Sequence, residues 1–124
     1  MTRWVVDGMN VIGSRPTGWW RDRPRAMREL AQELEAFAAA TGEEVTVVFD
    51  GRPFELETDD RVDVLFATRR GRNAADDDIA ELVEGDADPG SLSVVTSDRD
   101  LACRVRDGGA AVLGAGEFRR RLDG

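Results

Sequence analysis

The fold is decided by residues 3–14, which read Arg3-Trp4-Val5-Val6-Asp7-Gly8-Met9-Asn10-Val11-Ile12-Gly13-Ser14. The apolar run at 4–6 is typical of a strand that is buried on both faces of a parallel sheet. The run ends abruptly in Asp7-Gly8, and Gly8 lets the backbone turn sharply and approach another group closely. An acidic side chain at this point needs a hydrogen bond, a cation or water, because an unpaired buried carboxylate is very costly. Ligands of open parallel sheets bind beyond the carboxyl ends of the strands, so Asp7 and Asn10 are the first candidates for a functional site.

The length and charge of the chain limit its organisation and its partners. A chain of 124 residues suits one domain, and we find no internal repeat or linker, so we expect a single domain over residues 1–124. The net charge of −8 argues against binding a nucleic acid by bulk electrostatics. Contact with a nucleic acid would therefore depend on local arginine clusters and bound cations.

Two residue types are missing from the sequence. Without histidine, nucleophilic catalysis by serine–histidine or cysteine–histidine pairs is excluded. All 17 basic side chains are arginine, so the lysine that a Walker A motif or a Schiff-base enzyme needs is also missing. Hydrolytic chemistry in this chain would have to use carboxylates, and we expect a metal ion to act with them.

Cysteine content and hydropathy indicate the compartment. Cys103 is the single cysteine, so no intramolecular disulfide can form, and we expect it to be a small core residue in a reducing, cytoplasmic setting. The N-terminus lacks an apolar segment of signal-peptide length, and no apolar run approaches the length of a membrane span. We therefore expect no membrane partner.

Strand patterns alternate with helix patterns along the whole chain. We expect strands over 4–6, 44–50, 62–66, 92–96 and 111–113, and helices over 24–41, 75–83, 98–107 and 117–122, with a loop over 15–23. This alternation predicts an α/β fold with a mostly parallel central sheet covered by helices on both faces. Right-handed crossovers then bring the strand ends and the helix starts to one edge of the sheet.

Four aspartates are expected at this edge. Two of them directly follow strands and two begin the buried faces of helices; they are Asp7, Asp50, Asp76 and Asp98. Four carboxylates close together repel one another and cannot all stay ionised without cations. Ligand sets made only of oxygen select Mg²⁺ or Mn²⁺, and such an ion can polarise a phosphoryl oxygen and activate a bound water. Asn10 could hold that water or a phosphate oxygen.

These motifs resemble a known family. The chain is similar to NYN domains of the PIN-like nuclease superfamily, most closely the YacP-type branch. The matching segments occur in family order and span nearly the whole chain; they are 6–14, 48–51, 75–79, 95–100 and 114–118. The resemblance implies a PIN-like three-layer α/β/α sandwich. It also implies a hydrolase, a metal-dependent endoribonuclease that uses Mg²⁺ or Mn²⁺ and acts on RNA, either free or ribosome-associated.

The resemblance also assigns roles to individual residues. It implies that Asp7, Asp76 and Asp98 are catalytic metal ligands and that Asn10 is the polar catalytic and substrate-binding position after the first strand. Asp50 matches a less constant acidic position and Asp100 a variable one, so both are expected to assist in metal binding.

Each aspartate also has a purely structural interpretation. Asp7 can form an Asx-turn over Gly8, and Asp50-Gly51 is an ordinary turn pair. Asp98 can cap the helix that follows it, while Ser97 and Asp100 have the spacing of a capping box. The joint placement of several aspartates on one edge favours the functional interpretation.

Arginine and tryptophan side chains are the candidates for RNA contact. Arg69, Arg70 and Arg72 can meet phosphates as bidentate donors, or they can belong to a solvated loop. Trp19 and its neighbour Trp20 can stack on bases, although at least one of them is expected to cover the first long helix. Residues 119–121, three consecutive arginines, are expected to form a charged helix end.

Two other functions remain open at this point. The domain could be an inactive RNA- or ribosome-binding module, which metal binding without turnover would indicate. It could also be a metal-dependent phosphatase that acts on small phosphate esters. A nucleotide cofactor is rejected, because Gly114-Ala115-Gly116 lacks the third glycine of the dinucleotide fingerprint and Arg119 stands in its place. The sequence leaves the oligomeric state open.

Overall fold

The computed structural model describes residues 1–68 and 74–124 and shows a five-stranded parallel sheet. The strands are β1 (Arg3–Asp7), β2 (Glu44–Phe49), β3 (Val62–Phe66), β4 (Leu92–Val95) and β5 (Ala111–Leu113). Their spatial order is β3-β2-β1-β4-β5, so β1 lies at the centre between β2 and β4. The structure confirms the predicted α/β class, and every strand pair is parallel.

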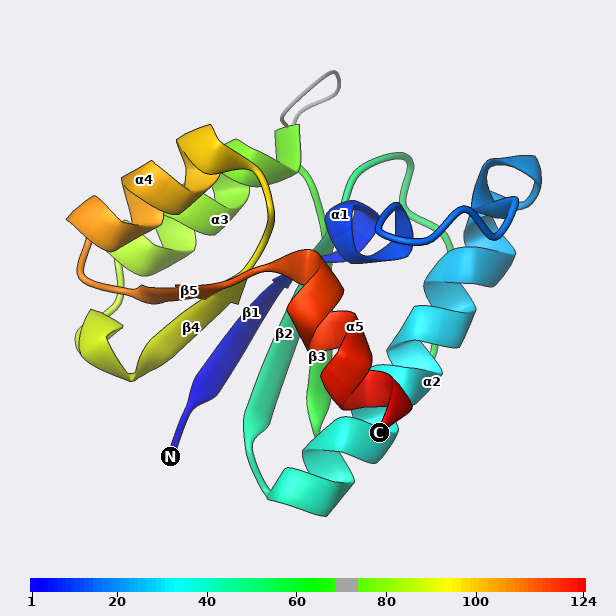
Figure 1. Cartoon of the computed structure of the whole chain (residues 1–124), viewed down its shortest axis with the longest axis horizontal. Helices are drawn as coiled ribbons and strands as arrows, with labels where there is room; N and C mark the ends of the chain where they lie inside the picture. Colours follow the sequence, from blue (N-terminus) through cyan, green and yellow to red (C-terminus); the bar gives the residue numbers. More distant parts are fainter. Residues whose placement is uncertain (69–73) are drawn as a thin grey trace.

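Helices cover both faces of this sheet (Figure 1). One face carries α1 (Gly8–Ile12), α2 (Arg23–Thr41) and α5 (Ala115–Asp123), and the other carries α3 (Ala74–Glu84) and α4 (Arg99–Asp107). Two short 3₁₀ turns, η1 (Trp19–Arg21) and η2 (Pro89–Ser91), lie in the connections. Two hydrophobic cores therefore exist, one on each side of the sheet.

The central strand shows why the sequence builds three layers. Trp4 and Val6 belong to the core under α2 and α5, whereas Val5 between them belongs to the core under α3 and α4. Successive side chains of a strand point to opposite faces, so an unbroken apolar run needs a core on each side. The Trp4 ring meets the rings of Phe37 and Phe118 at centroid distances of 5.7 and 5.4 Å, which ties α2 and α5 to the sheet.

The helix α1 was not predicted from the sequence. It begins directly after Asp7 and spans only five residues, Gly8–Ile12, which is too short to show a helical repeat. A Cβ atom at Gly8 would lie 2.4 Å from the Phe49 ring, so the expected close approach is confirmed. Glycine is needed here because the backbone of α1 packs directly against β2.

The expectation about Cys103 was wrong, and the one about the arginines at 119–121 was right. Cys103 is exposed rather than a core residue, because α4 turns Leu101, Ala102 and Val105 to the interior instead. The expected charged helix end is present in α5, whose last turn contains Arg120 and Arg121. Arg119 is buried, and its guanidinium donates a hydrogen bond to Glu33 of α2. Among residues 1–68 and 74–124, no helix is both long enough and apolar enough to cross a membrane.

Candidate active site at the carboxyl edge of the sheet

The structure brings together four of the predicted aspartates. Asp7 ends β1, Asp50 follows β2, Asp76 lies in the first turn of α3, and Asp98 directly precedes α4. They are close enough to influence one another, because Asp50 and Asp76 raise the pKa of Asp7, and Asp98 and Asp50 raise the pKa of Asp76. The carboxyl ends of the strands point toward this edge, where α1 also begins (Figure 1).

Asp7 is the most buried member of the group, with 5% of its surface exposed. Burial raises the pKa of its carboxyl group to about 7; a hydrogen bond from Thr96 opposes this rise, and the charges of Asp76 and Asp50 add to it. The Thr96 hydroxyl donates that hydrogen bond to Oδ2 of Asp7 over 3.0 Å. The ionised form of Asp7 is therefore costly, and a nearby cation would favour it.

Asp76 differs from the two aspartates that follow it. Its carboxylate accepts no hydrogen bond within residues 1–68 and 74–124, and its pKa is raised to about 6 by burial and by the charges of Asp98 and Asp50. Asp77 instead pairs with Arg104 of α4 at 2.9 Å, and Asp78 accepts hydrogen bonds from the backbone and hydroxyl of Thr68. Asp76 is thus the member of the trio that is directed at the site, as the helical count indicated.

Asp50 and Asp98 each combine a structural role with a place in the group. Oδ1 of Asp50 accepts a hydrogen bond of 2.9 Å from the Ala75 amide and so caps the first turn of α3. Oδ1 of Asp98 accepts one of 3.0 Å from the Leu101 amide and caps α4. The structural interpretations of both are therefore right. In the described part of the chain, Oδ2 of each carboxylate accepts no hydrogen bond and is free to bind a ligand.

The predicted capping box at Ser97 and Asp100 was wrong. Asp98 is the N-cap of α4, and the Ser97 hydroxyl instead accepts a hydrogen bond of 2.9 Å from the Ala115 amide at the start of α5. Asp100 is exposed in the first turn of α4 and is not among the principal charges that raise the pKa of Asp7 or Asp76. The structure therefore leaves Asp100 outside the group of four.

Asn10 lies in α1 and is held at the same edge. Its Oδ1 accepts a hydrogen bond of 2.8 Å from the backbone amide of Ser97. This contact fixes the orientation of the side chain. Its amide nitrogen makes no hydrogen bond within the described residues, so that nitrogen can donate to a ligand.

Thr96 is a site residue that the sequence analysis missed. It is 1% exposed, donates its hydroxyl proton to Asp7, and accepts a hydrogen bond of 3.1 Å from the Asp98 amide. It thereby links the end of β1 to the start of α4. A polar residue at the very end of the apolar β4 run was the available signal, but only the pairing of β1 with β4 shows which carboxylate it holds.

The structure describes the two tryptophans among the candidates for RNA contact, but not the three arginines. Arg69, Arg70 and Arg72 lie outside the described residues. Trp19 is half-buried against the core, and its ring carries the guanidinium of Arg23 at 5.9 Å from the ring centroid. Its neighbour Trp20 is 55% exposed. The prediction that at least one of the two covers a helix is confirmed, and base stacking by Trp19 stays a prediction.

The donors at this edge suit a hard divalent cation. They are carboxylate oxygens, and a cation would relieve the repulsion that raises the pKa of Asp7 and Asp76. Within residues 1–68 and 74–124, no three acidic or cysteine side chains are already arranged to hold a metal ion. The chemistry of these donors therefore suits such a cation, although their present arrangement does not form a ready-made site.

Comparison with known proteins identifies the family. Residues 4–124 match the sequence model of the YacP-like NYN domain. The chain belongs to the YacP-like NYN family. This confirms the resemblance that was inferred from the motifs, and the membership of this NYN domain indicates a nuclease-type fold.

Solved structures agree with this assignment. The crystal structure of a point mutant of Rae1 (YacP) from Bacillus subtilis is similar to this NYN domain with a TM-score of 0.82 and 28% identity, over 99% of this chain and 76% of that chain. A second crystal structure of Rae1 (YacP) from Bacillus subtilis gives a TM-score of 0.78 and 28% identity, over 99% of this chain and 74% of that chain. No curated protein sequence matches the chain significantly.

Proposed function

We propose that this NYN domain is a metal-dependent endoribonuclease that hydrolyses RNA phosphodiesters with Mg²⁺ or Mn²⁺. The observation that carries the proposal is the convergence of Asp7, Asp76, Asp98 and Asp50, with two carboxyl pKa values raised by burial and mutual repulsion. Perturbed carboxylates gathered at one edge of a parallel sheet are typical of a catalytic site. Family membership supports nuclease chemistry.

In the proposed site, Asp7 and Asp76 would hold the cation, and Asp98 and Asp50 would contribute the oxygens that accept no hydrogen bond. The chemistry supplied there would be a water of lowered pKa and polarisation of a phosphoryl oxygen. Thr96 orients Asp7 through its hydrogen bond to Oδ2. The amide nitrogen of Asn10, oriented by the contact with Ser97, donates to a phosphate oxygen of the substrate.

Labelled single-stranded and structured RNA should be incubated with the protein in Mn²⁺ or Mg²⁺, and in EDTA. Cleavage should occur with the metal, disappear in EDTA, and disappear in Asp7→Asn and Asp98→Asn. The matched control is Asp107→Asn, an exposed aspartate at the other end of α4, which should cleave as the wild type does. Cleavage that survives both site variants would show that the mechanism is wrong.

The alternatives have their own outcomes in the same experiment. A folded wild type that binds Mn²⁺ and RNA without cleaving the RNA is an RNA- or ribosome-binding module. A protein that hydrolyses a generic aryl phosphate and leaves RNA intact is a small-substrate phosphatase.

A further inference from the structure

A hollow of about 440 Å³ lies beside Asp98, between α4 and β5. We propose that it binds one nucleotide of single-stranded RNA next to the phosphodiester at the aspartates. The residues that line it include Asp98, Arg99, Ala102, Cys103, Arg106 and Val112. The proposal rests on the proposed function and deepens it, because it gives the substrate strand a position on the domain.

The lining of the hollow follows from the helical repeat of α4. Arg99, Ala102, Cys103 and Arg106 stand at spacings of three, four and seven residues, so they share one face of the helix. Leu101 and Val105, on another face, belong to the core. The hollow is therefore lined by one continuous stripe of α4 and by residues of β4 and β5.

The two arginines of this stripe are free to bind a ligand. Arg99 and Arg106 are exposed and form no ion pair within residues 1–68 and 74–124. Arg104 of the same helix is different, because Asp77 already neutralises it at 2.9 Å. A free guanidinium presents a planar fork of donors that matches phosphate oxygens. In a chain of net charge −8, two such groups beside the aspartates are suited to phosphates that flank the reacting one.

The rest of the hollow suits the sugar and base of the nucleotide. Ala102 and Val112 supply apolar atoms to the lining, while Ser97 and the two arginines supply polar atoms. A mixed lining of this kind is usual for small-ligand sites, and the volume lies in their range. Asp98 also lines the hollow, so the proposed subsite borders the group of aspartates.

A second hollow is less suitable for a phosphate. It lies beside Trp19 at the start of α2 and is lined by Arg21 and Arg25, but also by Asp22 and Glu29. Arg25 is paired with Glu29 at 3.1 Å, so much of its charge is already neutralised. The hollow at α4 has Asp98 as its single acidic lining residue.

Cys103 gives a direct test, because the single cysteine is exposed and lines the hollow. Alkylation of Cys103 by iodoacetamide is followed by mass spectrometry in the Asp7→Asn protein, which keeps the RNA intact. A saturating short single-stranded oligoribonucleotide should slow alkylation at least about fivefold. N-acetylcysteine in the same tube controls for any effect of RNA on the reagent.

Binding of the same labelled oligoribonucleotide by fluorescence anisotropy gives an independent readout. Arg99→Gln and Arg106→Gln in the Asp7→Asn protein should each weaken binding about five- to tenfold and lower the salt slope of log K by about 0.7 per lost phosphate contact. The matched control is Arg120→Gln on α5, which removes the same charge at an exposed position outside the hollow and should leave binding unchanged. Thermal melting verifies that each variant is folded.

The outcomes separate this proposal from the proposed function. Protection of Cys103 together with weaker binding by both arginine variants supports the subsite. RNA binding with an unprotected Cys103 and unchanged affinities overturns the subsite, while metal-dependent cleavage in the separate assay would still stand. Absence of RNA binding also overturns the subsite, and the cleavage assay then decides the proposed function by itself.

Discussion

The two ends of β1 carry polar clusters of opposite character. Arg3 begins the strand and is paired with the carboxylate of Asp86, whereas Asp7 ends it among carboxylates that repel one another. In the first cluster the pKa of Asp86 is lowered, chiefly by its hydrogen bonds with Arg3. In the second, burial and neighbouring charges raise the pKa of Asp7 to about 7.

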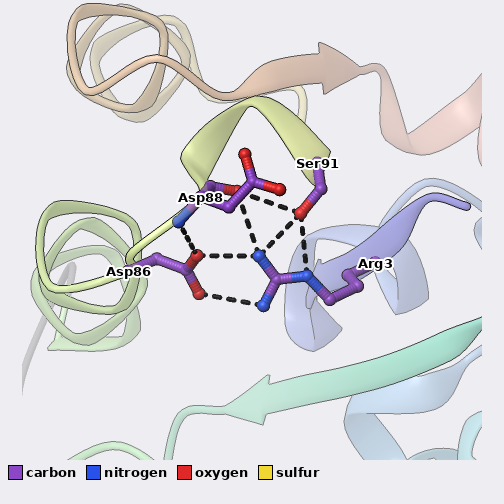
Figure 2. A network of polar contacts seen from close by, with 4 residues as sticks. All are labelled: Arg3, Asp86, Asp88 and Ser91. Atoms are coloured by element: carbon purple, nitrogen blue, oxygen red, sulfur yellow. Dashed lines mark hydrogen bonds and ion pairs between the residues drawn. The ribbon is translucent and has the colours of Figure 1, made fainter.

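The cluster at the start of β1 ties the strand to the connection between α3 and β4 (Figure 2). The Arg3 guanidinium donates to both oxygens of Asp86, at 2.7 and 3.0 Å, and to the carbonyl of Asp88 at 3.0 Å. Its Nε donates to the Ser91 hydroxyl at 2.8 Å. Such a network holds a loop in place, and it leaves little capacity for a ligand.

The difference between the clusters indicates their roles. Mutual neutralisation at the start of β1 favours the folded chain. Repulsion at the end of β1 disfavours the folded chain, and the proposed cation would relieve this repulsion, which is the behaviour expected of a site that gives up stability for function. The following four predictions test this contrast, beginning with the largest effect.

The largest effect should be on catalysis. Asp76→Asn should lower RNA cleavage in Mn²⁺ by at least about 100-fold, because it removes a proposed metal ligand. Asp86→Asn makes the same chemical change at the other cluster and should leave the rate per folded molecule unchanged. Equal losses in both variants would remove the functional distinction between the two ends of β1.

The second prediction concerns stability without metal. At pH 8 in EDTA, Asp7→Asn should raise the free energy of unfolding by at most about 4 kcal/mol, because the amide avoids a carboxylate whose folded pKa is raised from 3.8 to about 7. Between these two pKa values the folded state keeps the Asp7 proton and the unfolded state loses it. The destabilisation of the fold by Asp7 is therefore absent below about pH 4, grows as the pH rises, and is complete above about pH 7.

Urea denaturation at pH 5 and pH 8 measures this effect. The increase in the free energy of unfolding caused by Asp7→Asn should be larger at pH 8 than at pH 5. Saturating Mn²⁺ should reduce the difference between the variant and the wild type by stabilising the wild type. A variant that is less stable than the wild type at both pH values would contradict the interpretation of Asp7 as a destabilising carboxylate.

The third prediction concerns the backbone that follows Asp7. Gly8→Ala should destabilise the fold by about 2–3 kcal/mol, because its Cβ would lie 2.4 Å from the Phe49 ring. The matched control is Gly116→Ala in α5, where no atom lies within 4 Å of the added Cβ and the helix should gain up to about 1 kcal/mol. Thermal melting of both variants checks the contrast, and equal effects would refute the proposed close packing.

The smallest effect should come from the cluster at the start of β1. Arg3→Gln should lower the melting temperature by less than Gly8→Ala does, because these charges are partly exposed, with 33% of the Arg3 side chain and 21% of the Asp86 side chain accessible. The pKa of Asp86 is lowered, so its contribution is present above pH 3.8 and is lost as the pH falls below that value. Melting curves at pH 7 and pH 2.5 should therefore show a smaller difference between Arg3→Gln and the wild type at the lower pH.

Local pattern predicted much of the fold and of the site. Each predicted strand and long helix is present, because apolar runs and helical spacing are local signals. The helical count also singled out Asp76 among three consecutive aspartates. It could not indicate α1, which is too short for a repeat. It placed Cys103 in the core wrongly, and it did not show that Arg119 is buried, because burial depends on neighbouring elements.

The sequence by itself excluded histidine and lysine from any chemistry of this chain, and it placed Asp7 directly after a buried strand. Only the tertiary structure decided which group holds each carboxylate: Thr96 binds Asp7, and the Ala75 amide binds Asp50. These partners lie 89 and 25 residues away along the chain. Sequence periodicity reports on residues that are close together in the chain. The hydrogen bonds and the pKa shifts at this edge depend instead on which strands pair and how deeply their ends are buried.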